Sequence, residues 1–279
     1  MIDYFLASLA LIWIIYASIS DLKKREVPNW LSFSLIAFSL AYRALFSAIN
    51  ANLWFFVSGL IYLGIFIALG YAFYYARVFA GGDAKLLMSI GAILPVSSSF
   101  MSSLGISAIF IFLMLFFGGI WGLFFSFILA LKHKKEFKKE LGKQIKLNKK
   151  IFYYSFALAV PALILVYFDM IFIFIVILVL LSPILYVYAK SVEEACMIKT
   201  ISSSKLVEGD WLYQEVRIKG KTIKPNWEGL SEKQVSLLKK YNKKVKVKEG
   251  IPFVPSFFFA FISLICLLQF EFSIFNMFF

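Results

Sequence analysis

Two aspartates in this chain stand where an apolar stretch meets a polar one. Asp21 closes the first apolar stretch, within residues 20–29 (SDLKKREVPN), and Asp83 opens a later one, within residues 80–83 (AGGD). An ionisable group at a membrane boundary is costly to desolvate and is rare unless it has a role. Two acids at one depth can share a proton and activate a water molecule. The pair therefore predicts a membrane aspartyl protease.

Peptide hydrolysis by carboxyl groups needs two of them about one water molecule apart. One ionised acid removes a proton from water, while the other, protonated, polarises the scissile amide. Mutual repulsion separates their pKa values and keeps one proton on the pair. Because the titration belongs to the pair, the sequence leaves the acid and base roles of Asp21 and Asp83 open. Either residue alone would be read as an ordinary helix cap, and their matched depth is what favours catalysis.

The composition explains why these acids belong to a membrane protein. The chain has 279 residues, of which 61% are hydrophobic and 19% aromatic, including 33 Phe. A soluble domain of this size cannot bury so much apolar surface, so we expect an all-α polytopic membrane protein. About eight transmembrane helices are expected, over residues 4–20, 30–48, 53–76, 84–100, 104–131, 152–168, 170–189 and 252–272. The stretch 151–189 exceeds one span of about 20 residues, so we divide it into a hairpin near 167–169.

The loops between these segments alternate in charge. Lys and Arg gather after the first, third, fifth and seventh segments, while the opposite loops near 50–52, 97–99 and 169 contain neither. The positive-inside rule makes the basic side cytoplasmic and both termini extracellular. Asp21 and Asp83 are then both expected at the cytoplasmic face of the cell membrane. Arg43, inside the second segment, is the exception, and partial extension of its side chain towards the outer headgroups is the ordinary explanation.

A second basic feature is the loop at residues 132–150. Phe137, Leu141 and Ile145 are spaced four apart, which predicts a helix lying on the bilayer with its lysines towards anionic lipid headgroups. A solvated cytoplasmic loop that obeys the charge rule is the alternative interpretation. The loop has no interleaved stacking aromatics, so nucleic acid is not expected as a partner.

Residues 190–250 form the one sizeable polar region and predict a small cytoplasmic α+β insert. Two β-prone runs, 211–218 and 222–224, flank a Lys-Gly-Lys turn and predict a hairpin. Residues 231–234 (SEKQ) predict a capping box that opens a helix reaching about Tyr241.

Four domains follow from this division of the chain. We expect a catalytic four-helix membrane core at 1–103, additional membrane helices with the basic loop at 104–189, the insert at 190–250, and a C-terminal transmembrane helix at 251–279. Neither a metal nor a cofactor is expected. Cys196 and Cys266 form no CxxC pair, and the single histidine, His133, stands in a Lys-rich loop.

The two Asp motifs, in this order and separated by two further segments, resemble those of the GxGD-type prepilin peptidases. The archaeal preflagellin and prepilin peptidase branch is the most similar, because residues 208–211 (EGDW), 228–230 (EGL) and 250–255 (GIPFVP) also resemble its C-terminal region. Residues 104–190 are poorly covered. Ala80 replaces the first glycine of GxGD, and the CxxC pairs of the bacterial enzymes, with the N-methylation linked to them, have no counterpart here.

The resemblance implies a function for the named residues. Asp21 and Asp83 would be the catalytic pair, with Gly81 and Gly82 allowing a tight backbone turn and close approach. The substrate would be an archaellin or type IV pilin-like precursor, cut between a short basic leader and the hydrophobic helix. Four further residues would orient the acids or contact the substrate, unless they only reach the membrane interface: Lys23, Lys24, Arg25 and Lys85.

Two other functions are compatible with parts of the sequence. A presenilin-like or signal-peptide-peptidase-like protease also uses a GxGD aspartate, and residues 161–163 match its PAL tripeptide; here, however, the tripeptide precedes Asp169, which is expected on the outer side. A transporter or assembly-platform protein with ion-binding acids would need a polar path within the membrane. Arg43 is the main candidate for such a path.

Overall fold

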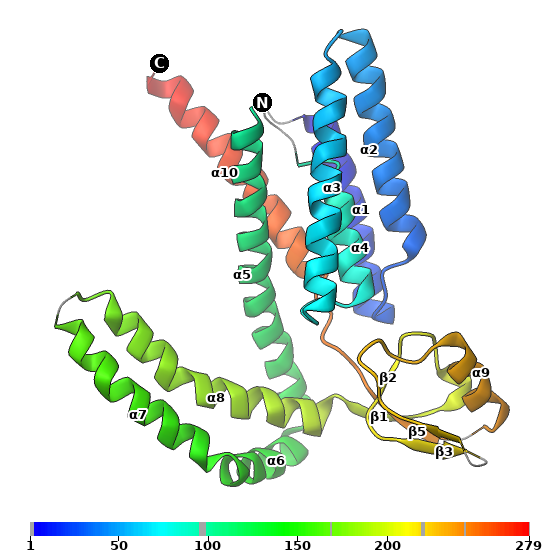
Figure 1. Cartoon of the computed structure of the whole chain (residues 1–279), viewed down its shortest axis with the longest axis vertical. Coiled ribbons are helices and arrows are strands. Elements are labelled where there is room, and N and C mark those ends of the chain that lie inside the picture. The colour runs from blue at the N-terminus through cyan, green and yellow to red at the C-terminus, as the bar shows by residue number, and fades with distance from the viewer. Residues whose placement is uncertain (1–2, 95–98, 168, 219–220, 243, 279) are drawn as a thin grey trace. The chain divides into compact units, whose positions relative to one another are not determined.

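The computed structural model describes residues 3–94, 99–167, 169–218, 221–242 and 244–278. Two compact units are present, Met1–Leu123 with Ile251–Phe279, and Phe124–Gly250. The long helix α5 (Phe100–Lys132) belongs partly to each. Figure 1 shows the elements in chain order, and each unit is described by itself.

The first unit is helical. Besides the first part of α5 it contains α1 (Tyr4–Lys24), α2 (Asn29–Ile49), α3 (Leu53–Tyr75), α4 (Gly81–Ile90) and α10 (Pro255–Phe278). Helix α4 packs against α2 and α3, while α10 packs against α1 (Figure 1). Buried Ile14, Phe66, Leu87 and Phe257 lie in the apolar core that these helices share. The core thus joins the N-terminal helices to a segment from the other end of the chain.

Among the described residues, six helices are long and apolar enough to cross a membrane by length and composition: α1, α2, α3, α5, α7 and α8. These helices and the strand-containing insert confirm the predicted fold class. The described apolar part of α10, Pro255–Gln269, is shorter. The expected segment at 84–100 is instead the ten-residue helix α4. At 1.5 Å per residue α4 is about 15 Å long, half of a bilayer core.

Two residues explain why α4 ends early. Gly91 lies so close to α3 that a Cβ atom there would meet the Tyr62 carbonyl oxygen at 2.8 Å. Pro95 follows shortly afterwards in the sequence, and a proline disfavours helical backbone in the residue before it. The apolar run therefore continues past the helix without extending it.

Arg43 lies inside the first unit, where its side chain is buried rather than extended towards the outside. The residue is fully buried on α2. Its guanidinium donates hydrogen bonds to the carbonyl oxygens of Phe55, Ala92 and Ile93 at 2.8, 2.8 and 3.1 Å. Carbonyl groups just beyond a helix end lack intrahelical donors, and the five N–H groups of arginine satisfy several at once. Arg43 therefore fastens the end of α4 to α2 and α3.

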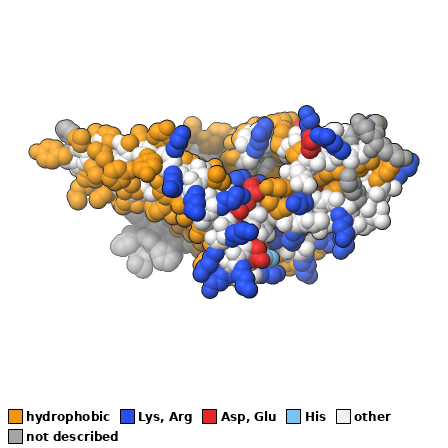
Figure 2. Space-filling view, turned by 90° about the horizontal axis from the view of Figure 1, so that it is seen from below, with side chains coloured by type: hydrophobic (Ala, Val, Ile, Leu, Met, Phe, Trp, Pro, Cys, Tyr) orange, Lys and Arg blue, Asp and Glu red, His pale blue; other side chains and the backbone are white. Residues whose placement is uncertain are grey.

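The membrane helices of the second unit are α7 (Lys149–Val166) and α8 (Phe172–Cys196). They pack as a hairpin, as predicted, and Ser155 donates to the Val179 carbonyl at 2.6 Å between them. Figure 2 shows the hairpin, at the left, covered mostly with hydrophobic side chains. An apolar exterior of this kind suits contact with lipid.

Helix α6 (Lys134–Leu147) forms in the basic loop and packs against α8. The Phe137 and Tyr188 rings meet edge to face with centroids 5.7 Å apart. Phe137 thus faces α8, whereas Ile145 is 44% exposed. The predicted helix is present. Of its predicted apolar face, Phe137 packs against α8 and Ile145 is exposed.

In its described residues the insert contains two small sheets, one α-helix and one short 3-10 helix. Strands β1 (Ile198–Ser202), β5 (Lys244–Lys248) and β2 (Trp211–Leu212) form an antiparallel sheet in that order. Strands β3 (Val216–Ile218) and β4 (Lys221–Ile223) form the predicted hairpin, preceded in the chain by the short helix η1 (Ser203–Lys205). The run 211–218 is thus two strands, β2 and β3, rather than one.

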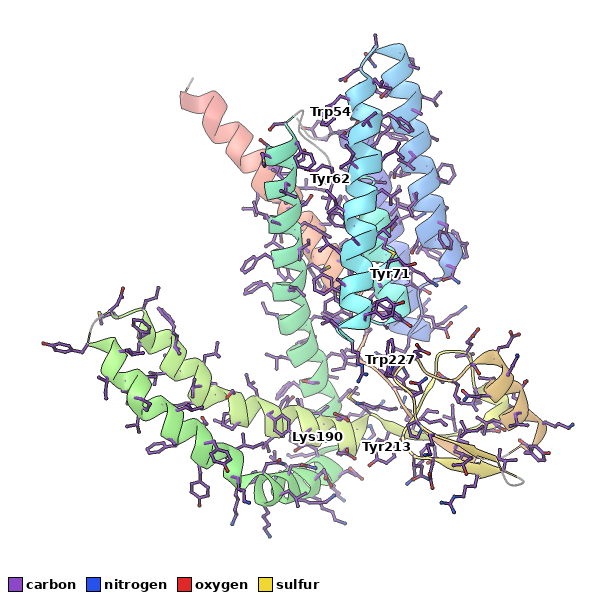
Figure 3. The ribbon with its side chains drawn as sticks, in the orientation of Figure 1. Trp54, Tyr62, Tyr71, Lys190, Tyr213 and Trp227 are labelled. Carbon is purple, nitrogen blue, oxygen red and sulfur yellow. The ribbon has the colours of Figure 1, made fainter. Side chains whose placement is uncertain are left out.

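The predicted capping box opens α9 (Glu232–Lys240), where the Ser231 amide donates to the Gln234 side chain at 3.0 Å. The insert is attached to the end of α8 by polar contacts. Lys248 pairs with Glu193 at 2.8 Å, and Tyr213 donates to Glu194 at 2.7 Å; Tyr213 and nearby Lys190 are labelled in Figure 3. Lys248 is the last residue of β5 and Tyr213 directly follows β2, so these bonds link the three-stranded sheet to a membrane helix.

Candidate active site

Asp21 lies in the last turn of α1. The helix ends at Arg25, whose left-handed backbone (φ 61°) lets its amide donate to the Asp21 carbonyl at 2.9 Å. The Asp21 side chain is buried, with 6% of the residue exposed. A buried carboxylate is costly unless polar groups solvate it.

The partner of the Asp21 side chain comes from the far end of the sequence. The backbone amide of Val254 donates to Asp21 Oδ2 at 3.0 Å. Ser18, one turn earlier on α1, donates to the Ile14 carbonyl and lies 3.5 Å from the Val254 carbonyl oxygen. Residues just before α10 therefore lie directly against the end of α1.

Asp83 is the third residue of α4. Its Oδ2 accepts a hydrogen bond of 3.3 Å from the amide of Ala80, which precedes the helix in extended backbone. The side chain is half-buried. This position at a helix N-terminus favours a negative charge, because the first N–H groups of a helix have no intrahelical acceptor.

The two glycines before Asp83 have different surroundings. A Cβ atom on Gly82 would lie 3.3 Å from both the amide nitrogen and the Cβ of Val27, whereas one on Gly81 would meet only Tyr74, at 3.8 Å. Gly82 thus permits a close approach between the start of α4 and the connection that follows α1. That connection is the one that begins just after Asp21.

A second contact ties α4 to the same connection. Lys85 Nζ donates to Asn29 Oδ1 at 2.7 Å, joining the first turn of α4 to the first residue of α2. Together with the Gly82 contact, this bond places the end of α1 and the start of α4 at one end of the first unit. Asp21 and Asp83 lie in those two places.

The charge of one acid acts on the other. Burial, and after it the negative charge of Asp21, raises the pKa of Asp83 to about 7, while the hydrogen bond from Ala80 acts in the opposite direction. An interaction of this kind requires the carboxyl groups to be within electrostatic reach. The structure therefore brings together the two acids that the sequence singled out.

The basic residues near the two acids differ in their exposure and in their partners. Lys23 and Lys24 are exposed, and Arg25 is partly buried within electrostatic reach of Asp21. Lys85 is engaged by Asn29. Their contacts with substrate stay a prediction. Within the described ranges, no group of three or more His, Cys, Asp or Glu residues is arranged to hold a metal ion.

Sequence reasoning missed the contribution of residues 251–255. The motif GIPFVP drew attention as a similarity, but nothing in it indicated that the Val254 amide meets Asp21. The donor is a backbone group, which no side-chain pattern reveals. The proline at 255 was the available signal, because proline often begins a helix and leaves the preceding residue to cap it.

The chain is similar to known proteins over the region that holds both aspartates. Residues 8–128 match the model of the type IV leader peptidase family, and both aspartates lie inside the match. The chain is 33% identical over 94 residues to the prepilin peptidase EppA of Methanothermobacter thermautotrophicus, which covers 34% of this chain and 24% of the relative. It is 30% identical over 95 residues to the preflagellin peptidase of Methanocaldococcus jannaschii, covering 34% of this chain and 39% of the relative.

The matched segments thus span well under half of either relative. No solved structure matches the chain. The part of the chain that carries Asp21 and Asp83, residues 8–128, is thus similar to the type IV leader peptidase family.

Proposed function

We propose that this protein is a membrane aspartyl endopeptidase that removes the short basic leader from archaellin or type IV pilin-like precursors. Asp21 and Asp83 would be its catalytic pair. The observation that carries the proposal is their juxtaposition: the end of α1 and the start of α4 lie together, and the charge of one acid acts on the other. Both residues fall inside the family match, and the two relatives are named as prepilin and preflagellin peptidases.

In the first step, water attacks the carbonyl carbon of the scissile amide. The ionised acid takes a proton from the water as the new C–O bond forms, and the protonated acid gives its proton to the carbonyl oxygen as the C=O π bond breaks. A neutral gem-diol results. The pair still holds one proton, which came from the water and now lies on the acid that was ionised at the start.

In the second step, the newly protonated acid gives its proton to the leaving nitrogen as the C–N bond breaks. The other acid takes a proton from one hydroxyl of the gem-diol, and the C=O bond forms again. The products are the leader with a new carboxyl group and the mature subunit with a new amine. Both acids return to their starting states, so no further reactant is consumed.

By the positive-inside rule, the basic loops favour the cytoplasmic face of the cell membrane for this chemistry, with both termini outside. A cut at that face suits the substrate, because a basic leader stays inside while the adjoining helix remains in the bilayer. Membrane lipids would surround the α7–α8 hairpin, whose exposed side chains are largely apolar.

Coexpression with archaellin and pilin precursors tests the proposal. We expect a shortened precursor with the wild-type chain and none with Asp21→Asn or Asp83→Asn. Asp169→Asn is the matched control, since Asp169 is exposed between α7 and α8 and should be dispensable. Processing by either site variant would refute the paired-acid mechanism. Unprocessed precursors throughout, with well-folded wild-type protein, would favour the transporter or assembly-platform alternative.

A further inference from the structure

We infer that residues 251–257 form part of the active site and that the Val254 amide is a positioning group that keeps Asp21 as the ionised acid. Asp21 would then activate the water, and Asp83 would carry the shared proton. The inference rests on the proposed function. It concerns a segment outside the family match, which ends at residue 128.

The contact between Val254 and Asp21 is buried, and it joins residues that are far apart in the sequence. Val254 N and Asp21 Oδ2 are 3.0 Å apart, separated by 233 residues, and Val254 is fully buried. A hydrogen bond from an amide to a carboxylate stabilises the charged form relative to the neutral one. In a site with little water, such a bond is worth more than it would be at the surface.

The donor belongs to the N-terminus of a helix. Pro255 is the first residue of α10, and the Val254 carbonyl accepts from the Phe257 amide at 2.9 Å. The Val254 N–H is therefore one of the groups that a helix start leaves without an intrahelical acceptor. Asp21 supplies that acceptor, and the positive end of the helix dipole adds to the preference for an ionised Asp21.

Asp83 has a weaker donor. The hydrogen bond that its carboxylate accepts from Ala80 is 3.3 Å long, compared with 3.0 Å for the bond from Val254 to Asp21. Burial and the negative charge of Asp21 also raise the pKa of Asp83 to about 7. Both observations assign the shared proton to Asp83, which the sequence left open.

The segment is fixed on both sides of the site. Trp121 on α5 donates its indole N–H to the Pro252 carbonyl at 2.9 Å. The Phe253 ring lies where a Cβ atom on Gly118 would collide with it, and it packs against Phe79 with centroids 5.1 Å apart. Phe79 directly precedes the Ala80–Asp83 turn. Residues 252–254 thus contact the element that carries each acid.

Replacing Val254 by proline removes this donor while retaining a backbone that can precede a helix. Val254→Ala is the matched control, because it shortens the side chain and keeps the amide. We expect Val254→Ala to keep the wild-type pH profile of precursor cleavage. For Val254→Pro we expect the acidic limb to move to higher pH, with cleavage below neutrality about tenfold slower or worse. Equal activities and superimposable profiles of folded Val254→Pro and wild type would overturn the inference.

Infrared titration supplies a readout that does not require cleavage. The carboxyl band of Asp21 is identified by its loss in Asp21→Asn, and its appearance on acidification is followed in the full-length wild type and both Val254 variants. We expect protonation at higher pH in Val254→Pro alone. If no precursor is cleaved by the wild type, the proposed function fails while this titration still decides the inference. An unchanged midpoint would refute it.

Trp121→Phe provides a second test in case the proline variant does not fold. It removes the donor to Pro252 while keeping an aromatic ring, so it should loosen the segment and shift the Asp21 titration in the same direction by a smaller amount. If Val254→Pro does not fold, this variant decides the matter. A Trp121→Phe titration identical to that of the wild type would then count against the inference.

Discussion

Gly82 and Val27 are in such close contact that a Cβ atom on the glycine would lie 3.3 Å from the valine amide nitrogen. This approach joins the turn before Asp83 to the connection after Asp21. We expect Gly82→Ala to displace one acid from the other and to lower kcat/KM about tenfold or more, since catalytic geometry tolerates little misplacement. A processing assay with purified protein measures the effect.

Gly81→Ala is the control for this prediction. Its Cβ atom would meet only Tyr74, at an ordinary contact distance of 3.8 Å. Its rate should stay within about twofold of wild type, because alanine also favours the helix. Equal losses in the two alanine variants would show that the close contact at Gly82 has no special importance.

Arg43 supplies the second prediction. Arg43→Met removes the guanidinium donors to three carbonyl groups, of which that of Phe55 also accepts from Ser58 Oγ, and an unsatisfied buried acceptor costs about 1–3 kcal/mol. We expect the unfolding free energy to fall by about 2–5 kcal/mol, measured by denaturation in detergent. Arg217→Met, at an exposed pair with Glu215, should cost less than about 1 kcal/mol. Similar losses at both positions would contradict the role of Arg43.

The pH dependence of cleavage is the third prediction. The pKa of Asp83 is raised to about 7, chiefly by burial, so its neutral form persists below that pH. Because the proposed mechanism needs Asp83 protonated, the rate should decline as the pH rises through about 7. A pH–rate profile under single-turnover conditions checks this. A rate that stays constant far above neutrality would exclude Asp83 as the proton donor.

Helix α6 gives a fourth prediction, on lipids. Exposed lysines lie on the side of the helix away from Phe137, which contacts α8, and they include Lys135, Lys139 and Lys146. Helices α5 and α7, both able to span a membrane, flank α6 in the chain. We expect anionic lipid to raise the thermal midpoint of the protein in nanodiscs, and added salt to weaken the effect.

Changing these three lysines to glutamine should reduce that stabilisation. The same change at Lys233, Lys239 and Lys240 on α9 alters the net charge equally and serves as the control. If both triple variants respond to anionic lipid as the wild type does, α6 is a solvated helix and not a lipid-binding surface.

The sequence predicted the parts of the site that depend on local patterns. Asp21 and Asp83 stand at boundaries of apolar runs, and such runs predict helix ends. The alternation of loop charge gave them a common depth. The Ser231–Gln234 capping box was found in the same way, because its residues are neighbours in sequence.

What escaped prediction depends on contacts between distant residues. The sequence did not predict that Arg43 is buried. The carbonyl groups that bind it come from α3 and from the end of α4, and no pattern near Arg43 indicates them. The length of α4 depends on its close contact with α3 at Gly91. Val254 acts through its backbone amide, so its residue type carried no information about the contact with Asp21.

The central claim is that Asp21 and Asp83 act as one catalytic unit, and a double-mutant cycle on precursor cleavage tests it most directly. Residues that work as a unit are strongly non-additive, so Asp21→Asn, Asp83→Asn and the double variant should all fall to the same residual rate, about a thousandfold or more below wild type. Multiplicative losses, or substantial cleavage by either single variant, would contradict the claim.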